Sequence, residues 1–289
     1  MIPGFARHDI TVGGIRIALE CAGCGPPLLL LHGYPQTRMC WHLVAPRLAR
    51  RFTVVVPDLR GYGDSDKPPG SPDHREYSKR TMAEDLVAVM RTLGFRRFGV
   101  AGHDRGGRVG HRMALDNPDV VDRLAVLDIV PTRTLFAGTD RAFATAYYHW
   151  FFLIQPDGLP ERMIGGDPEW FLRETVRRWS GPGRQVAEEA LAEYVRCFCR
   201  PEAVHASCED YRAAAGIDLE HDAADTGPLR QPLLVLWGAH GAMERLNDVL
   251  ATWRVLATDV RGHHLACGHF LPEECPDETA EAIEGFFGA

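Results

Sequence analysis

Hydrophobic positions along this chain alternate between short continuous apolar runs and longer stretches in which apolar residues recur with helical spacing. Continuous runs at residues 27–31, 52–56 and 232–237 are typical of strands buried within a sheet. Residues 78–93 and 105–116 show the helical spacing instead. This alternation of strands and helices predicts a largely parallel sheet covered by helices on both faces.

Other segments extend the same order. We expect a hairpin of two strands around Gly13-Gly14, followed by a helix at residues 39–50. The remaining expected elements are strands at 98–101, 124–127 and 254–260 and a helix at 278–287. Between residues 131 and 225 the strand-like runs disappear and aromatic-rich helical patterns take over. The sequence therefore predicts a core of residues 1–130 and 226–289 with an inserted helical cap at 131–225.

Composition and charge narrow the class of protein. The chain has 289 residues, of which 45% are hydrophobic, enough for a large core with an inserted cap. Its net charge of −7 argues against nucleic acid or an anionic membrane as a partner. The longest aliphatic run, residues 28–31, is far shorter than the about 20 residues that span a bilayer. The first residues lack the pattern of a secretion signal, so we expect a cytoplasmic protein.

Neither cysteines nor histidines predict a metal site. Eight cysteines in 289 residues do not make a disulfide scaffold, and the Cys21–Cys24 pair lacks the second pair of a zinc site. His263, His264 and His269 lack a carboxylate at ligand spacing. We expect reduced thiols, no metal and no cofactor.

The most informative motif is Gly102-His-Asp-Arg-Gly106, which lies between an expected strand and an expected helix. This is the context of a nucleophile elbow, the sharp strand-to-helix turn of α/β-hydrolases. Its central residue is usually Ser, but here it is Asp104. A carboxylate needs no base to deprotonate it and can displace a leaving group from saturated carbon, giving an ester. The elbow therefore predicts Asp104 as a nucleophile.

Two further residues would complete a catalytic triad. His269 lies in a loop after the last expected strand and is the candidate base for water. The loop after Trp237 has no carboxylate before Glu244, so we assign the orienting acid to Asp128, at the end of the strand that follows the elbow helix. Taken alone, each has a simpler interpretation: either aspartate could cap a helix or turn, and the histidine could lie exposed in a loop. Their order along the chain favours catalysis.

Backbone N–H groups of Tyr34 and Arg105 are the expected oxyanion donors. The side chains of Arg105 and Arg108, three residues apart in the first turn of a helix, share one face. Cations there oppose the helix dipole, which suggests a functional reason. Two guanidinium forks would clamp a substrate carboxylate. The alternative is that Arg108 pairs with an acidic residue of the cap.

With these motifs in place, the chain resembles the fluoroacetate (haloacetate) dehalogenases of the α/β-hydrolase superfamily over nearly its whole length. Hydrolase loops such as Asp58-Leu-Arg-Gly-Tyr-Gly-Asp-Ser65 are shared widely, whereas Asp-Arg-Gly-Gly-Arg and Tyr-His-Trp are more specific. The motifs are His32-Gly-Tyr-Pro-Gln36, Asp58–Ser65, Gly102-His-Asp-Arg-Gly-Gly-Arg108, Tyr148-His-Trp150 and Gly268-His-Phe-Leu-Pro272.

The resemblance implies an α/β-hydrolase fold, a small haloacid substrate and a homodimer. It also implies that Arg105 and Arg108 bind the carboxylate, and that His149, Trp150 and Tyr211 donate hydrogen bonds to the departing halide. Fluoride is a poor leaving group, so donors aimed at its developing charge suit this chemistry. The competing interpretation is an aromatic helix face packed on the core, which fits Phe151 and Phe152 better than their polar-tipped neighbours.

Three other functions stay open at this point. An epoxide hydrolase uses a similar aspartate elbow, but it typically lacks an arginine directly after the nucleophile. A non-catalytic binding protein would not need the complete set of Asp104, Asp128 and His269. A serine esterase is disfavoured because the elbow carries no serine. Residue types alone do not decide which halide or which carboxylate is preferred.

Overall fold

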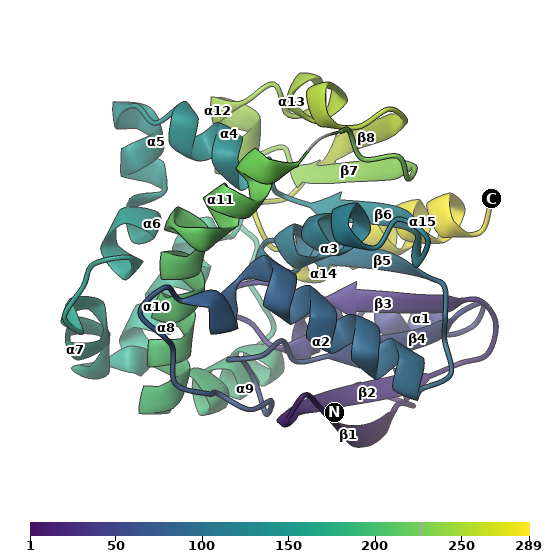
Figure 1. Ribbon diagram of the computed structural model, residues 1–289, viewed down its shortest axis with the longest axis horizontal. Coiled ribbons are helices and arrows are strands. Elements are labelled where there is room, and N and C mark those ends of the chain that lie inside the picture. Colours follow the sequence, from purple (N-terminus) through teal and green to yellow (C-terminus); the bar gives the residue numbers. More distant parts are fainter. Residues whose placement is uncertain (226) are drawn as a thin grey trace.

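The computed structural model describes residues 1–225 and 227–289, which form an eight-stranded sheet (Figure 1). Its strand order is β1-β2-β4-β3-β5-β6-β7-β8; β2 pairs antiparallel with both β1 and β4, and the other neighbours pair parallel. The predicted, largely parallel sheet is confirmed. The strands are β1 (Ala6–Val12), β2 (Ile15–Ala22), β3 (Pro27–Leu31), β4 (Thr53–Pro57), β5 (Phe98–His103), β6 (Val121–Leu127), β7 (Leu233–Gly238) and β8 (Val260–Leu265).

The central strands are apolar because both of their faces are covered. Every residue of β5 and β7 is buried, and in Figure 1 α2 and α3 lie over one face of the sheet while α1 and α15 lie on the other. The helices of this core are η1 (Arg38–Trp41), α1 (Ala45–Leu48), η2 (Arg75–Tyr77), α2 (Lys79–Thr92), α3 (Arg105–Asp116), α12 (Ala242–Leu246), α13 (Val249–Leu256), α14 (Leu271–Glu274) and α15 (Pro276–Phe287).

The segment predicted as the cap, residues 131–225, contains helices joined by loops and no strand, and it gathers beyond one end of the strands (Figure 1). Its helices are α4 (Thr132–Ala137), α5 (Arg141–Ala146), α6 (Tyr148–Leu153), α7 (Leu159–Gly165), α8 (Pro168–Trp179), α9 (Glu188–Phe198), α10 (Pro201–Ala215) and α11 (Ile217–Ala224). The division into core and cap domains stays a prediction, and its second boundary falls at Thr226, outside the described residues.

Two expected elements are wrong in detail. Instead of one helix at residues 39–50, the chain forms η1 and the single turn α1. Pro46 lacks an N–H group and lies in the first turn of α1, so a continuous helical ladder through this point would be broken.

The expected strand at residues 254–260 is also wrong, because residues 254–256 are the last part of α13. Asp248 caps this helix by accepting a hydrogen bond from the N–H of Ala251 (2.9 Å), a local signal that outweighs the β-branched composition. The last strand starts later, at Val260, where it pairs with Leu233 of β7.

All eight cysteines lie in the described residues and are free thiols. Among the helices of the described residues, none combines the length and apolar character that a membrane span needs.

Candidate active site

Asp104 lies in the sharp turn between β5 and α3, with φ 45° and ψ −114°. A non-glycine residue with positive φ is strained, and such strain is typical of a nucleophile elbow. The turn is tight because small residues flank it. A Cβ atom on Gly106 would lie 2.5 Å from the carbonyl oxygen of His32, and one on Gly102 would meet the carbonyl of Gly106. The two glycines therefore let β5, α3 and the loop after β3 approach one another around the Asp104 carboxylate.

The Asp104 carboxylate is ionised although it is only 7% exposed. Burial alone raises its pKa, but the neighbouring charges of His269, Arg105 and Arg108 outweigh burial and hold the pKa below its usual value. The N–H of Tyr34 donates a hydrogen bond to Oδ2 (3.0 Å), as an oxyanion donor in this position would. At neutral pH the group is thus a buried anion with its charge available for attack.

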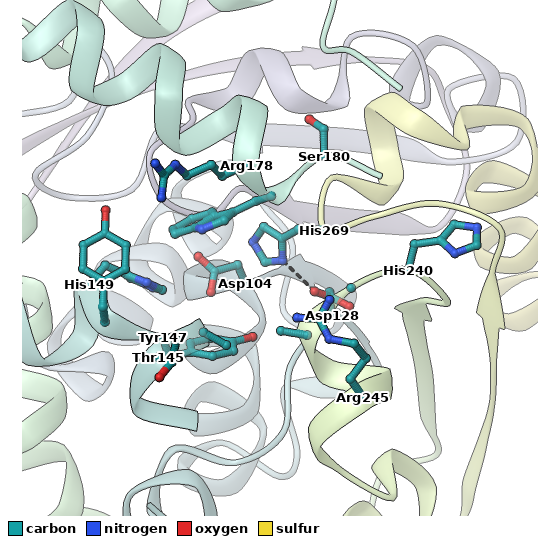
Figure 2. Close-up of a pocket in the computed structure, with 15 residues that line it drawn as sticks. Asp104, Asp128, Thr145, Tyr147, His149, Arg178, Ser180, His240, Arg245 and His269 are labelled. Carbon is teal, nitrogen blue, oxygen red and sulfur yellow. Dashed lines mark hydrogen bonds and ion pairs between the residues drawn. The ribbon is translucent and has the colours of Figure 1, made fainter. Parts of the chain in front are cut away.

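His269 and Asp128 come together as the sequence order suggested. The Nδ1–H of His269 donates to Oδ2 of Asp128 (2.6 Å), and Oδ1 of Asp128 accepts from the N–H of Gly238 (3.0 Å). Figure 2 shows His269 between Asp104 and Asp128. Nε2 of His269 is buried and has no hydrogen-bond partner among the described residues, so it is free to take a proton from water.

The ionisation of His269 suits a base. Burial lowers its pKa, but the hydrogen bond and charge of Asp128, together with the charge of Asp104, raise the pKa above its usual value. His103 holds the loop in place, because its Nε2–H donates to the carbonyl of His269 (2.8 Å).

Arg108 is a buried cation held by neutral oxygens. Its Nη1 donates to the carbonyl of Val130 (3.0 Å) and to Oγ1 of Thr132 (2.8 Å), and its guanidinium lies 4.8 Å from the centre of the Trp150 ring. Its Nε is buried without a partner among the described residues. Burial and the nearby Arg105 lower the pKa of Arg108, whereas Asp104 raises it, so the charge lacks full compensation.

Arg105 corrects the expectation of two free guanidinium forks. Its Nε and Nη2 donate to the two carboxylate oxygens of Asp210 (2.9 and 2.7 Å), and Nη2 also reaches the Asp210 carbonyl (2.9 Å). Of its nitrogens, only Nη1 has no partner among the described residues, and the whole side chain is buried. The alternative weighed for Arg108, a pair with an acid of the cap, is thus realised by its neighbour.

The predicted halide donors surround the two arginines. Tyr211 lies under the Arg105 guanidinium (4.2 Å to the ring centre), 5.7 Å from the His149 ring and 6.3 Å from the Trp150 ring. Burial lowers the pKa of His149 to about 3, so the ring is neutral, and its Nδ1 has no partner in the described part of the chain. The Tyr34 ring is 5.3 Å from that of Tyr211, and its hydroxyl is also unpartnered there. The structure therefore brings every predicted site residue into one buried cluster.

A cavity of about 190 Å³ leads to this cluster between cap and core. Of the predicted residues, Asp104, Asp128, His149 and His269 line it, whereas the two arginines, Tyr34, Trp150 and Tyr211 do not. Figure 2 shows Tyr147 on one side and His149 on another side of Asp104. The complete lining is Asp104, Asp128, Thr145, Ala146, Tyr147, Tyr148, His149, Arg178, Trp179, Ser180, His240, Gly241, Ala242, Arg245 and His269.

Sequence reasoning missed several residues in and around the site. Trp179 forms a wall of the cavity, with its ring 4.5 Å from His149 and 5.4 Å from His269; its aromatic character was visible, but its position depends on how α8 packs. Asp210 carries no motif of its own, and its partner lies 105 residues away in the chain. Arg178 and Arg245 reach the cavity from exposed positions on α8 and α12. The described residues hold no group of three His, Cys, Asp or Glu side chains that could bind a metal ion.

Comparisons with known proteins agree with this geometry. The alpha/beta hydrolase fold family matches residues 26–274, and a solved α/β hydrolase from Nostoc sp. PCC 7120 superposes with a TM-score of 0.98 at 56% identity, covering 99% of both chains. The chain therefore belongs to the alpha/beta hydrolase fold family, as the sequence predicted.

Within that family, the chain is 48% identical to fluoroacetate dehalogenase of Burkholderia sp., over 99% of this chain and 95% of the relative. The resemblance to the haloacetate dehalogenases is thereby confirmed. The chain is also 36% identical to a soluble epoxide hydrolase of Corynebacterium sp. strain C12, over 97% of this chain and 96% of that protein.

Proposed function

We propose that this protein is a haloacetate dehalogenase that converts a small 2-haloacid into the 2-hydroxy acid and halide. The observation that carries the proposal is Arg108, a buried guanidinium whose described hydrogen bonds go only to neutral oxygens, beside the ionised Asp104. A buried cation needs an anionic partner, and a substrate carboxylate supplies one next to the nucleophile. The similarity to fluoroacetate dehalogenase supports the same substrate class.

In the first step, a carboxylate oxygen of Asp104 attacks the α-carbon from the side opposite the halogen. The new C–O bond forms an ester as the carbon–halogen bond breaks, and the halide leaves with the bonding electron pair. His149, Trp150 and Tyr211 would donate hydrogen bonds to the halide, while Arg108 and Nη1 of Arg105 hold the carboxylate. Both ends of the substrate are then held while its α-carbon faces Asp104.

In the second step, Nε2 of His269 takes a proton from water, and the hydroxide oxygen attacks Cγ of Asp104. Asp128 stabilises the imidazolium that forms. The N–H groups of Tyr34 and Arg105 would stabilise the oxyanion of the tetrahedral intermediate. Its collapse breaks the ester bond and releases the 2-hydroxy acid, whose oxygen takes the proton back from His269, and the Asp104 carboxyl group then loses its remaining proton to solvent.

Two measurements test the proposal. A fluoride electrode with fluoroacetate, beside a chloride assay with chloroacetate, should show halide release that Asp104→Ala abolishes. A single turnover in heavy-oxygen water should place the label in Asp104 and leave the first product unlabelled. Near-normal turnover by Asp104→Ala, or label in the first product, would contradict the aspartyl-ester route.

Epoxide hydrolysis is the second candidate, and one observation favours it. Tyr147 lies in the turn between α5 and α6 and Tyr211 lies on α10, and both are close enough to Asp104 for its charge to contribute to raising their pKa, after burial as the main cause. Phenol hydroxyls can protonate an epoxide oxygen. Styrene oxide lacks a carboxylate, so a higher kcat/KM for styrene oxide than for chloroacetate would favour this function.

A further inference from the structure

Asp210 of the cap helix α10 is fully buried and is shared by three side chains of the core. Besides its paired bonds to Arg105, Oδ2 accepts from the hydroxyl of Tyr62 (2.6 Å), and Oδ1 pairs with the ammonium group of Lys79. Lys79 in turn pairs with Asp218 (3.4 Å). Two cations and two carboxylates therefore balance, whereas Arg108 forms no ion pair with a carboxylate among the described residues.

In this arrangement the two arginines have different roles. Arg105 is neutralised by Asp210, so it contributes a directed N–H donor, Nη1, rather than net charge. Arg108 contributes the charge. Such a division suits a substrate with a single carboxylate, because one guanidinium supplies the opposite charge and the other supplies a directed donor.

The pair also links two parts of the site that lie on different elements. Arg105 begins α3 of the core, whereas Asp210 is followed directly by Tyr211 on the cap. Because the Asp210 carboxylate holds two nitrogens of Arg105 at once, it fixes both the distance and the plane of the guanidinium. The same plane lies 4.2 Å from the Tyr211 ring centre.

We propose that Asp210 is a positioning residue: it holds Arg105 so that Nη1 alone is presented to the substrate carboxylate. This inference rests on the proposed function and adds to it a residue that acts through Arg105. Asp210 does not touch the substrate, so its effect should disappear when Arg105 is absent.

A double-mutant cycle tests this dependence with Asp210→Asn, Arg105→Met and the double variant. The dissociation constant of acetate, a carboxylate without a leaving group, is measured by ligand-observed NMR, and KM and kcat are measured with chloroacetate. Asp210→Asn should weaken acetate binding about tenfold or more and raise KM, and the double variant should bind acetate no more weakly than Arg105→Met. Additive losses, or acetate binding by Asp210→Asn that matches the parent protein, would overturn the proposal.

Asp85→Asn is the matched control, because Asp85 also holds a buried arginine by two bonds (Arg60, both 2.7 Å), but this arginine is not one of the site residues. It should leave acetate binding unchanged even if it lowers the melting temperature.

Asp210→Asn leaves the two buried cations Arg105 and Lys79 with one carboxylate, Asp218, instead of two. A second variant therefore covers the case in which Asp210→Asn fails to fold. Asp210→Glu keeps the charge but displaces the guanidinium by one methylene group. It should fold and still bind acetate weakly, whereas parental acetate affinity would show that only charge balance matters. If the parent protein releases no chloride from chloroacetate, the proposed function fails. The double-mutant cycle measured by acetate binding still tests whether Asp210 acts through Arg105.

Discussion

At the scale of single residues, the chemistry of this site depends on which buried charges are compensated. Asp104 stays ionised because cations surround it, and His269 keeps a raised pKa because Asp128 accepts its Nδ1 proton. Arg108 is the exception, since its described bonds go to neutral oxygens. A single substitution can remove each of these charges, so the role of each can be tested separately.

The pH dependence of turnover should report the ionisation of His269. Its pKa lies above the usual value, and only the neutral ring accepts a proton from water, so kcat should fall as the pH drops through that raised pKa. Asp128→Asn removes the main cause of the raised pKa. The acid limb of kcat should then move to lower pH, and kcat itself should fall by about 10²–10⁴. A pH–rate profile of chloride release measures both effects; an unmoved acid limb would exclude His269 as the titrating base.

Removing the charge of Arg108 should weaken binding of the substrate. Arg108→Met removes a charge-assisted hydrogen bond worth about 1.5–3 kcal/mol, so KM for chloroacetate should rise about 10- to 100-fold. Arg112→Met is the control on the same helix. Arg112 pairs with Asp116 and Asp225 away from the cavity, so its loss should lower stability but leave KM unchanged. Steady-state kinetics of both variants measure these effects. An unchanged KM in Arg108→Met would contradict the proposal that Arg108 binds the substrate carboxylate.

At the scale of elements, the site is made by the ends of strands that the sheet brings to one edge. Asp104 follows β5 and Asp128 follows β6, and these strands are paired neighbours. The loop after β8 is held to the cap by Glu274, whose Oε2 accepts from the N–H groups of both Gly181 and Gly268 (2.8 and 2.7 Å). One carboxylate oxygen therefore binds both the loop that carries His269 and the cap segment after α8.

Close packing at the elbow should make Gly106 intolerant of a side chain. In Gly106→Ala, the added Cβ would overlap the backbone after β3, so we expect a loss of about 3 kcal/mol or more in the free energy of unfolding, together with reduced kcat. Gly285 lies inside α15 with nothing within 4 Å of such an atom, so Gly285→Ala should stabilise the protein by about 0.5–1 kcal/mol. Urea unfolding of both variants would refute this account if their changes were equal.

Glu273 should make stability depend on pH. This buried carboxyl in α14 accepts from the Tyr194 hydroxyl of the cap (2.9 Å) and from the Gln36 amide of the core. Burial raises its pKa to about 8, so the folded protein holds a proton that the unfolded chain, with a pKa near 4.5, releases. The protonated Glu273 side chain therefore adds a few kcal/mol to the free energy of unfolding below about pH 4.5, and this contribution is lost as the pH rises to about 8.

Glu273→Gln mimics the neutral carboxyl and should flatten this part of the stability curve, so the variant should exceed the parent protein in melting temperature at pH 8. Glu278→Gln removes an exposed acid of α15 and should leave the curve unchanged. Melting curves between pH 5 and pH 9 measure the effect; parallel curves for parent and Glu273→Gln would contradict it.

At the scale of the whole molecule, the proposed function requires an acidic protein to admit an anionic substrate. The net charge of −7 repels anions, but the exposed residue Arg245 lines the cavity and offsets this charge locally. Arg178 also lines the cavity but pairs with Glu174 (2.6 Å). Figure 2 shows Arg178 and Arg245 on opposite sides of the catalytic cluster, one from the cap and one from the core. The cap thus contributes cavity walls, and the core contributes the cationic Arg245.

Arg245→Gln should lower kcat/KM for chloroacetate at low ionic strength, because it weakens the attraction of the anion to the cavity. Salt screens such an exposed charge, so the difference from the parent protein should shrink above about 0.15 M salt. Arg254→Gln, an exposed arginine of α13 that does not line the cavity, is the control. A loss of kcat/KM that salt leaves unchanged would point to direct contact with the substrate instead.

The sequence by itself determined the order of strands and helices, the aspartate elbow and the three residues of the predicted triad. These features are local: apolar runs specify buried strands, and a small set of residues specifies a tight turn before a helix. Local rules failed where two patterns competed, as at residues 254–256, where a capped helix replaces the expected strand.

Only the tertiary structure decided how the charges are paired. Asp210 is 105 residues from Arg105, and no spacing rule relates positions on separate domains or elements. Burial makes such pairing decisive, since an unpaired ion inside a protein is costly and a paired one is held in a single orientation. For this reason the sequence named both arginines, but only the tertiary structure shows that Arg105 of α3 is paired with Asp210 of α10, whereas the described hydrogen bonds of Arg108 go to neutral oxygens.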